Sequence, residues 1–207
     1  MIRNARKEDA KAIAPLILVI LEDMELPFVA RYGVDQTLAV LEKGIQTEDY
    51  RYSYRRALVD EEDGVVAGVA FGYPDCDEPT IDKPLEAILQ SMGLPQDEQL
   101  FTDPETFPEE WYLDTISVNA DFRGRGIGSH LLAALPAFAK EQGQSVIGLS
   151  VDLGNPNAKR LYTRAGFEVV GQRMISGHQY DHMQKKSKKE PFPLSDNQRE
   201  TVLLFHD

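Results

Sequence analysis

The stretch RGRGIGSHLL, residues 123–132, contains three glycines in its first six positions and then becomes apolar. Glycine loses more backbone freedom on folding than any other residue, so a cluster of glycines needs a physical reason. The segment before it, LDTISV at 113–118, belongs to a strand-like run. The apolar residues after it recur at helical spacing, namely Ile127, Leu131, Leu135 and Phe138. The sequence therefore predicts a strand, a tight glycine loop and a helix in direct succession.

A glycine loop that opens a helix is suited to bind an anion. Gly124, Gly126 and Gly128 leave successive backbone N–H groups uncovered, and the helix adds its unpaired donors and its positive dipole end. Ser129 adds a hydroxyl group beside them. We interpret the loop as a pyrophosphate site. Two alternatives remain open: a glycine turn that only allows close helix–strand packing, and a dinucleotide site, whose G-x-G-x-x-G spacing the loop does not match.

A second motif, NPNAKRLYTRAGF at 155–167, has the boundaries of a short helix. Asn155 is a plausible N-cap, Pro156 stands at the first helical position, and Gly166 ends the helix. Tyr162 lies at the border of the apolar face, where its ring packs while its hydroxyl reaches a cleft. The alternative is a half-buried tyrosine with a purely structural role.

Together the two motifs resemble the GNAT superfamily of N-acetyltransferases. The acyl-CoA signature of that family is matched by Arg123, Gly126 and Gly128. Its second signature is matched by Asn155, Ala158, Leu161, Tyr162, Gly166 and Phe167. The resemblance covers about residues 1–184 and is tight only over 111–167. It implies an α/β (α+β) fold: a mixed, mostly antiparallel twisted sheet of about seven strands with flanking helices, splayed between the fourth and fifth strands.

The resemblance also implies direct transfer of acetyl from acetyl-CoA to an amine, without an acyl-enzyme. Peptide groups on the strand before the loop would hold the pantetheine arm and polarise the thioester oxygen. Tyr162 would protonate the departing thiolate, because a phenol is an adequate acid for it. The expected cofactor-binding residues are Ile116, Ser117, Val118, Arg123, Gly124, Arg125, Gly126, Ile127, Gly128, Ser129, Asn155, Asn157 and Tyr162.

The group that deprotonates the incoming ammonium is less well defined by the sequence. Glu110 and Asp114 project to one face of the predicted strand, because residues i and i+4 of a strand point the same way. We expect Asp114 to be nearer the reacting centre. The alternative is that Asp114 only forms an ion pair with an arginine of the preceding hairpin, which contains Arg51, Arg55 and Arg56.

Three other reactive side chains are poor candidates. Cys76 has no histidine near it in sequence, and direct transfer needs no nucleophile. His178 and His182 have the spacing of a helical metal pair, but their segment is predicted as strand and loop. We therefore expect no metal site.

Composition limits the possible partners. The chain has 207 residues with 42% hydrophobic side chains, enough for one domain. Its formal net charge is −12, which disfavours nucleic acid and favours a cationic or neutral partner. Cys76 is the only cysteine, and no secretory signal precedes the domain, so we expect a cytoplasmic protein. The longest apolar run, 12–21, is too short to span a membrane.

The order of elements is readable from the periodicity. We expect strands over 2–6, 52–60, 65–74, 111–118, 145–151, 167–175 and 178–184, and helices over 10–24, 35–43, 85–92, 128–143 and 155–166. Pro136 should kink the fourth helix or loosen its later turns. The domain is expected over 1–184 and a C-terminal tail over 185–207, whose TVLLF segment is either an edge strand or disordered.

Residues 75–110 form an acidic insertion between two predicted strands. They contain eleven carboxylates against the single cation Lys83. The segment either steers a cationic acceptor toward the site or only aids solubility.

We expect acetyl-CoA and an amine acceptor as partners, with a homodimer left open. The alternative function is a module that binds or senses acyl-CoA without turnover.

Overall fold

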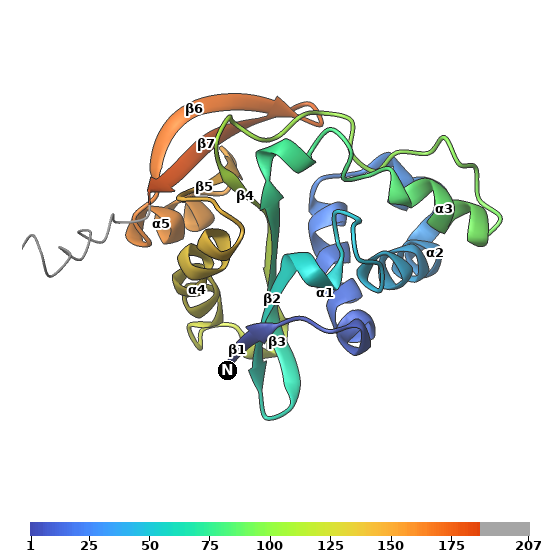
Figure 1. Ribbon diagram of the computed structural model, residues 1–207, viewed down its shortest axis with the longest axis horizontal. Coiled ribbons are helices and arrows are strands. Elements are labelled where there is room, and N and C mark those ends of the chain that lie inside the picture. Colours follow the sequence, from blue (N-terminus) through green and yellow to red (C-terminus); the bar gives the residue numbers. More distant parts are fainter. Residues whose placement is uncertain (187–207) are drawn as a thin grey trace, which may run out of the picture.

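The computed structural model describes residues 1–186 of the chain. One seven-stranded sheet, in the order β1-β2-β3-β4-β5-β7-β6, separates two helical layers (Figure 1). The strands are β1 Ile2–Asn4, β2 Ala57–Glu62, β3 Val65–Pro74, β4 Trp111–Val118, β5 Val146–Asp152, β6 Glu168–Ile175 and β7 His178–Lys186. The helices are α1 Ala10–Asp23, α2 Pro27–Ile45, α3 Pro84–Ser91, α4 Ile127–Glu141 and α5 Pro156–Arg164. The predicted fold class is confirmed.

Neighbouring strands are antiparallel except for β4 and β5, which are parallel. Their pairing covers only residues 111–113 of β4 and 147–149 of β5. Beyond that point the two strands diverge, so the backbone edge of β4 that faces β5 has no strand partner. The expected splay between the fourth and fifth strands is therefore present.

Apolar side chains form a separate core on each face of the sheet. The α4 face packs Trp111, Leu113 and Ile127 together. The opposite face packs Ile17, Leu41 and others from α1 and α2. Figure 1 shows α4 and α5 on one side of the sheet and α1, α2 and α3 on the other.

A bulge in β4 changes the alternation of side chains. Thr115 is paired with Phe71 and Leu113 with Gly72, which leaves Asp114 without a partner on β3. An extra residue of this kind turns two successive side chains toward one face. Thr115 Oγ1 accordingly donates a hydrogen bond to Asp114 Oδ2 at 2.9 Å.

The helical and strand boundaries differ from expectation in three places. The second helix begins at Pro27 and is interrupted at Gly33, whose φ of 77° is non-helical. The second strand starts only at Ala57, because 54–56 form a 3₁₀ turn. The helix α4 continues through Pro136 to Glu141, so the expected loosening after the proline is wrong.

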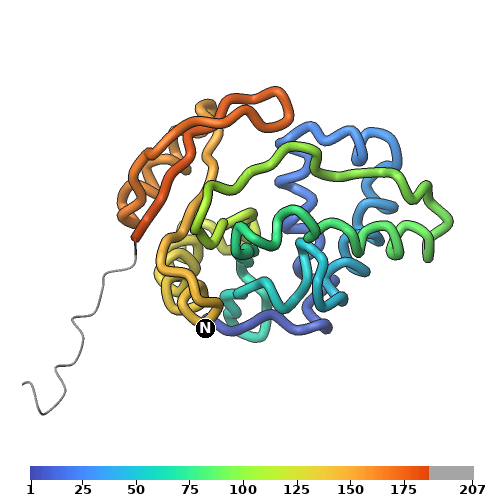
Figure 2. Tube along the Cα trace, turned by 45° about the horizontal axis from the view of Figure 1, so that its top comes forward, coloured from blue at the N-terminus to red at the C-terminus, as the bar shows by residue number. Residues whose placement is uncertain are grey.

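The acidic insertion joins β3 to β4, as predicted. It contains α3 and a long return segment that crosses in front of the α1 and α2 layer (Figure 2). At the other end of the chain, β7 includes Lys185 and Lys186, which the sequence placed in the tail. The TVLLF segment lies outside the described residues. Within 1–186, no helix is both long and apolar enough to cross a membrane.

Candidate active site

The divergence of β4 and β5 opens a cleft of about 430 Å³. Its walls come from both strands, from α5 and from the C-terminal end of α1. Tyr162 and Asn155 lie on one wall, and Asp114 and Glu105 on the other. Ser150 of β5 also lines it. The cleft thus brings together Tyr162, predicted from the motif at 155–167, and Asp114, predicted from the alternation of the strand before the glycine loop.

The glycine loop borders a second cavity of about 610 Å³. Gly124 and Gly126 have φ values of 77° and 84°, in the left-handed region that favours glycine. Gly126 is the N-cap of α4, so the loop leads directly into the helix, as expected. The cavity is lined by Val118, Phe122, Arg123, Gly124, Gly126, Ile127, Gly128, Ser129, Asn157, Ala158, Leu161 and Arg164. It therefore joins residues of both sequence motifs with the end of β4.

Not all of the predicted cofactor-binding residues lie on these cavities. Ile116 lines the first cavity and Val118 the second, whereas Ser117 lines neither. Arg125 lies near Glu62, with 3.5 Å between its Nη1 and the carboxylate. Asn155 Oδ1 accepts a hydrogen bond from the Ala158 backbone at 3.0 Å and so caps α5.

Tyr162 is half-buried against the α4 core, and its ring contacts Phe167 edge-on at 6.1 Å. Burial raises the pKa of Tyr162 to about 12. The phenol therefore keeps its proton throughout the neutral range, as a proton donor must.

Arg51 organises the opposite wall of the cleft. Its guanidinium is 2% exposed and donates to Asp82 at 2.8 Å, to Asp114 at 2.5 Å and to the hydroxyl of Tyr73 at 2.7 Å. It also lies 4.4 Å from the centre of the Phe101 ring. The ion pair between Asp114 and a hairpin arginine, left open by the sequence, is thus present.

Glu105 is the residue on this wall that sequence reasoning did not single out for catalysis. It is 6% exposed, and its Oε2 accepts a hydrogen bond from Tyr112 at 2.8 Å. Burial and, next, the charge of Asp114 raise the pKa of Glu105 to about 8. A carboxyl group with a pKa near neutrality that faces a cleft is a candidate acid or base. Burial together with a place on the cleft distinguishes Glu105 from the ten other acids of its segment, and the sequence does not encode either property locally.

Glu110 lies away from the cleft. It is fully buried beneath β7, where it contacts His182 at 3.0 Å and Gln184 at 2.8 Å. Its side chain does not line the cavity that contains Asp114. Glu110 is therefore not positioned to contact a substrate bound in that cavity.

The remaining reactive side chains are dispersed. Cys76 is exposed, and the two histidines contact different carboxylates: His178 lies 3.7 Å from Asp152, and His182 contacts Glu110. Within residues 1–186, no three His, Cys, Asp or Glu side chains are grouped as metal ligands.

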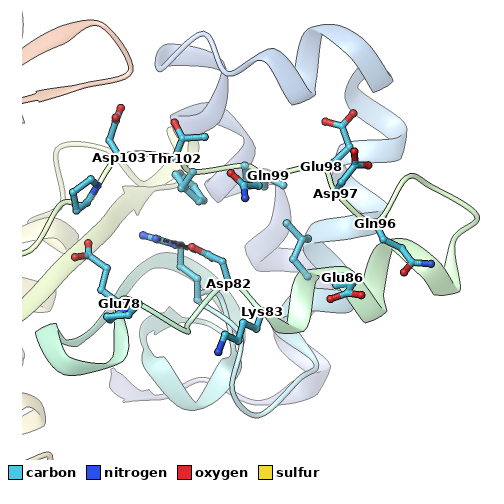
Figure 3. A pocket seen from close by; sticks show the side chains of 16 residues that line it. Glu78, Asp82, Lys83, Glu86, Gln96, Asp97, Glu98, Gln99, Thr102 and Asp103 are labelled. Atoms are coloured by element: carbon cyan, nitrogen blue, oxygen red, sulfur yellow. Dashed lines mark hydrogen bonds and ion pairs between the residues drawn. The ribbon is translucent and has the colours of Figure 1, made fainter.

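An acidic cleft of about 590 Å³ lies beside Arg51 (Figure 3). Carboxylates from the two arms of the insertion face each other across it, namely Glu78, Asp82, Glu86, Asp97, Glu98 and Asp103. Arg51 also lines this cleft, so its guanidinium separates the acidic cleft from the wall that contains Asp114 and Glu105.

Comparisons with known proteins agree with this geometry. A crystal structure described as that of an acetyltransferase is 51% identical, with a TM-score of 0.84, and the match covers 91% of this chain and 100% of that one. An N-acetyltransferase from Staphylococcus aureus Mu50 is 32% identical, with a TM-score of 0.79 over 89% of this chain and 100% of that one. An uncharacterized N-acetyltransferase of Methanocaldococcus jannaschii is 28% identical over 81% of this chain.

The chain spans only part of its curated relatives, 60% of the M. jannaschii protein and smaller shares of the next two. A structure of a putative acetyltransferase from Salmonella typhimurium, solved with acetyl-CoA, is 23% identical and shares the fold with a TM-score of 0.57. The acetyltransferase (GNAT) family itself matches residues 21–167, most of the chain. The chain belongs to the acetyltransferase (GNAT) family.

Proposed function

We propose that this protein is an N-acetyltransferase that moves acetyl from acetyl-CoA directly onto a primary amine. The observation that carries the proposal is the β4–β5 cleft, which has Tyr162 on one wall and Glu105 on the other. The glycine loop lies beyond the open end of the splay, where the pyrophosphate of CoA would bind. The cavities fit an extended ligand with an anionic end.

On the CoA side, backbone groups make most of the proposed contacts. The unpaired edge of β4 from Asp114 to Val118 offers peptide groups to the pantetheine arm and to the thioester oxygen. Such donors stabilise the oxyanion that develops during attack, by about 3–4 kcal/mol for one donor. Tyr162 gives its proton to the departing sulfur.

On the acceptor side, we assign the general base to Glu105 in place of Asp114. Asp114 already accepts hydrogen bonds from Arg51 and Thr115, so both of its carboxylate oxygens are engaged by the protein's own donors. Glu105 lies 3.7 Å from Arg51, and its pKa is raised to about 8, near the value that suits a general base at neutral pH. We therefore assign Asp114 to holding Arg51, and Glu105 to removing the ammonium proton.

The acceptor is a small cationic molecule or a protein amino group. Two partial relatives support an amine acceptor: an N-alpha-acetyltransferase RimI of Mycobacterium tuberculosis, 41% identical over 33% of this chain, and an L-methionine sulfoximine/L-methionine sulfone acetyltransferase of Pseudomonas aeruginosa, 36% identical over 32%. The carboxylates around the acidic cleft favour a positive charge on the molecule that approaches.

Ligand binding and turnover test the proposal together. Acetyl-CoA at about 100 times its dissociation constant should stabilise the fold by about 2.7 kcal/mol, whereas NAD should not. Release of the CoA thiol should then depend on one or more members of an amine library. Stabilisation without release for any amine would favour the alternative, a module that binds acyl-CoA without turnover.

Replacing Tyr162 with Phe tests the acid. Within the described residues, the Tyr162 hydroxyl forms no hydrogen bond that the substitution would break. The variant should therefore fold and bind acetyl-CoA normally. Loss of a general acid should lower kcat by about 100-fold or more. Unchanged turnover under conditions where chemistry limits the rate would mean that another group protonates the thiolate.

A further inference from the structure

Behind the cleft, three side chains from three segments form one hydrogen-bonded chain. Ser150 Oγ on β5 lies 3.2 Å from His182 Nδ1 on β7. His182 Nε2 lies 3.0 Å from Glu110 Oε2, at the start of β4. The order hydroxyl, imidazole, carboxylate is the arrangement by which enzymes activate a serine.

The surrounding donors fix where the protons lie. Glu110 also accepts hydrogen bonds from the Phe107 backbone at 2.7 Å and from Gln184 Nε2 at 2.8 Å. Because these neighbours donate to the Glu110 oxygens, we take Glu110 as the acceptor of its third contact as well, with the Nε2–H of His182 as the donor. Nδ1 is then the free base nitrogen, and the hydroxyl of Ser150 donates to it.

The packing holds this array rigidly. His182 and Glu110 are both 0% exposed, and the Phe107 ring stacks on the imidazole at 3.8 Å and 4°. Gly148 makes room for the carboxylate, since a Cβ there would lie 1.9 Å from Glu110 Oε2. Burying polar groups of this kind is costly, and apolar side chains in their place would pack at a lower cost.

Ser150 is the member of the array that reaches the cleft. It follows Leu149, the last residue of β5 that pairs with β4, so it stands at the point where the strands begin to diverge. It lines the same cavity as Asp114, Ile116 and Tyr162. An acyl thioester bound along the free edge of β4 would therefore lie opposite an activated hydroxyl.

We propose that Ser150, with His182 and Glu110, accepts the acyl group when no amine is bound, and that the protein then acts as a slow acyl-CoA hydrolase. The inference rests on the proposed binding of acyl-CoA in the cleft. Ser150 Oγ bonds to the acyl carbon, the C–S bond breaks, and the hydroxyl proton passes through His182 to the sulfur. Water then attacks the ester and gives a proton to His182, which returns it to Oγ as acetate leaves.

The test uses the full chain with acetyl-CoA and no amine. We expect slow release of CoA and acetate, and, after acid quenching, protein that is one acetyl group heavier on the peptide that contains Ser150. Ser150→Ala should abolish the adduct and lower amine-free release by about 100-fold. His182→Gln should do the same, and Glu110→Gln should lower release without removing Ser150.

Ser145, exposed just before the same strand, provides the matched control, and Ser145→Ala should behave as the wild type. Acetyl-CoA should still stabilise Ser150→Ala in a thermal-shift measurement, which shows that the variant folds and binds the thioester. Equal amine-free release in Ser150→Ala and wild type, or an adduct on another residue, would overturn the inference. Loss of acetyl-CoA binding in the wild type itself would instead overturn the proposed function.

Discussion

The two ends of the cleft are built in opposite ways. The end at which we propose that CoA binds consists of the glycine loop, α4 and α5, all within one stretch of the chain, and it offers backbone groups to a ligand. The proposed acceptor end and the layer behind it are held by side-chain contacts between distant segments: Arg51 reaches Asp114 across 63 positions on the cleft, and Glu110 reaches His182 across 72 behind it. One end depends on local conformation, the other on long-range charge.

This difference predicts different responses to mutation. Backbone donors at the loop stay in place when a neighbouring side chain changes, because φ and ψ of a few residues define them. The acceptor end loses its charge balance when any one partner is removed, because the remaining charges are buried without compensation. Substitutions at the acceptor end should therefore affect both stability and activity, and those at the loop should separate the two.

The largest effect is expected from Arg51→Met, which keeps the apolar stem and removes the charge. Asp82, Asp114 and Glu105 would then face one another without their shared cation. Breaking a buried ion pair by removing one partner costs about 3–5 kcal/mol, and urea unfolding should show a loss of this size.

Arg55→Met is the matched control, because the ion pair of Arg55 with Glu48 is more than half exposed on both sides. It should leave the urea midpoint almost unchanged. Equal losses of unfolding free energy for the two arginines would mean that the buried Arg51 cluster stabilises the fold no more than an exposed ion pair does.

The next largest effect is expected from Glu105→Gln, which should lower kcat/KM by about 100-fold on the alkaline side of the pH–rate profile. Because the pKa of Glu105 is raised to about 8, the wild-type rate should rise with pH through that region, and the variant should lack this limb. Glu109→Gln, at an exposed neighbour in the same segment, should keep the limb. A limb that persists in Glu105→Gln would assign the base elsewhere.

The same shift predicts a stability slope of known sign. The folded chain keeps the Glu105 proton from its ordinary pKa of 4.5 up to about 8, where the unfolded chain has lost it. The stability that this proton contributes is complete below the lower value and decreases as pH rises toward the upper one. Urea unfolding against pH should show this decrease in the wild type and a smaller one in Glu105→Gln.

A single methyl group should have opposite effects at the two ends. In Gly148→Ala, the new Cβ would meet the buried carboxylate of Glu110, so we expect a loss of about 1–3 kcal/mol in unfolding free energy. Gly128 lies inside α4, and in Gly128→Ala the new Cβ would make an ordinary van der Waals contact with Leu161 of α5 at 3.7 Å. That variant should be as stable as the wild type or more so, and should still bind acetyl-CoA. Equal losses would contradict the assigned roles of the two glycines.

The contrast between the two ends also explains what the sequence could predict. The loop and the α5 motif were readable because glycine positions, the Asn155 cap and Pro156 act within a few residues. The mixed, mostly antiparallel sheet and its splay between the fourth and fifth strands followed from the family resemblance once both motifs were recognised. Helix breaks at Gly33 and the unbroken α4 at Pro136 depended on tertiary packing, which local propensity does not contain.

At the acceptor end, prediction was limited by the number of equivalent acids. Eleven carboxylates in one segment have the same local appearance, and only folding decides that Glu105 and Glu110 become buried while Asp97 stays exposed. The sequence WYLDTISV also contains no signal that predicts the bulge at Asp114. Asp114 was found because it lies on a recognisable strand, and Glu105 was missed as a base because it lies on a loop.

The smallest effect concerns the exposed carboxylates of the acidic cleft. Glu86 and Asp97 line it, both are exposed, and no ion pair occupies either of them within residues 1–186 (Figure 3). If they attract a cationic acceptor, kcat/KM should fall as salt rises, because the Debye length is about 10 Å at 0.1 M. Glu86→Gln with Asp97→Asn should flatten that dependence and leave kcat and stability unchanged, whereas Asp63→Asn with Glu168→Gln, two exposed acids elsewhere on the sheet, should not. The kcat/KM for an uncharged amine should be unchanged by both pairs of substitutions. A salt dependence that is equal in the two double variants would mean that the net charge of the whole chain, and not the acidic cleft, attracts the acceptor.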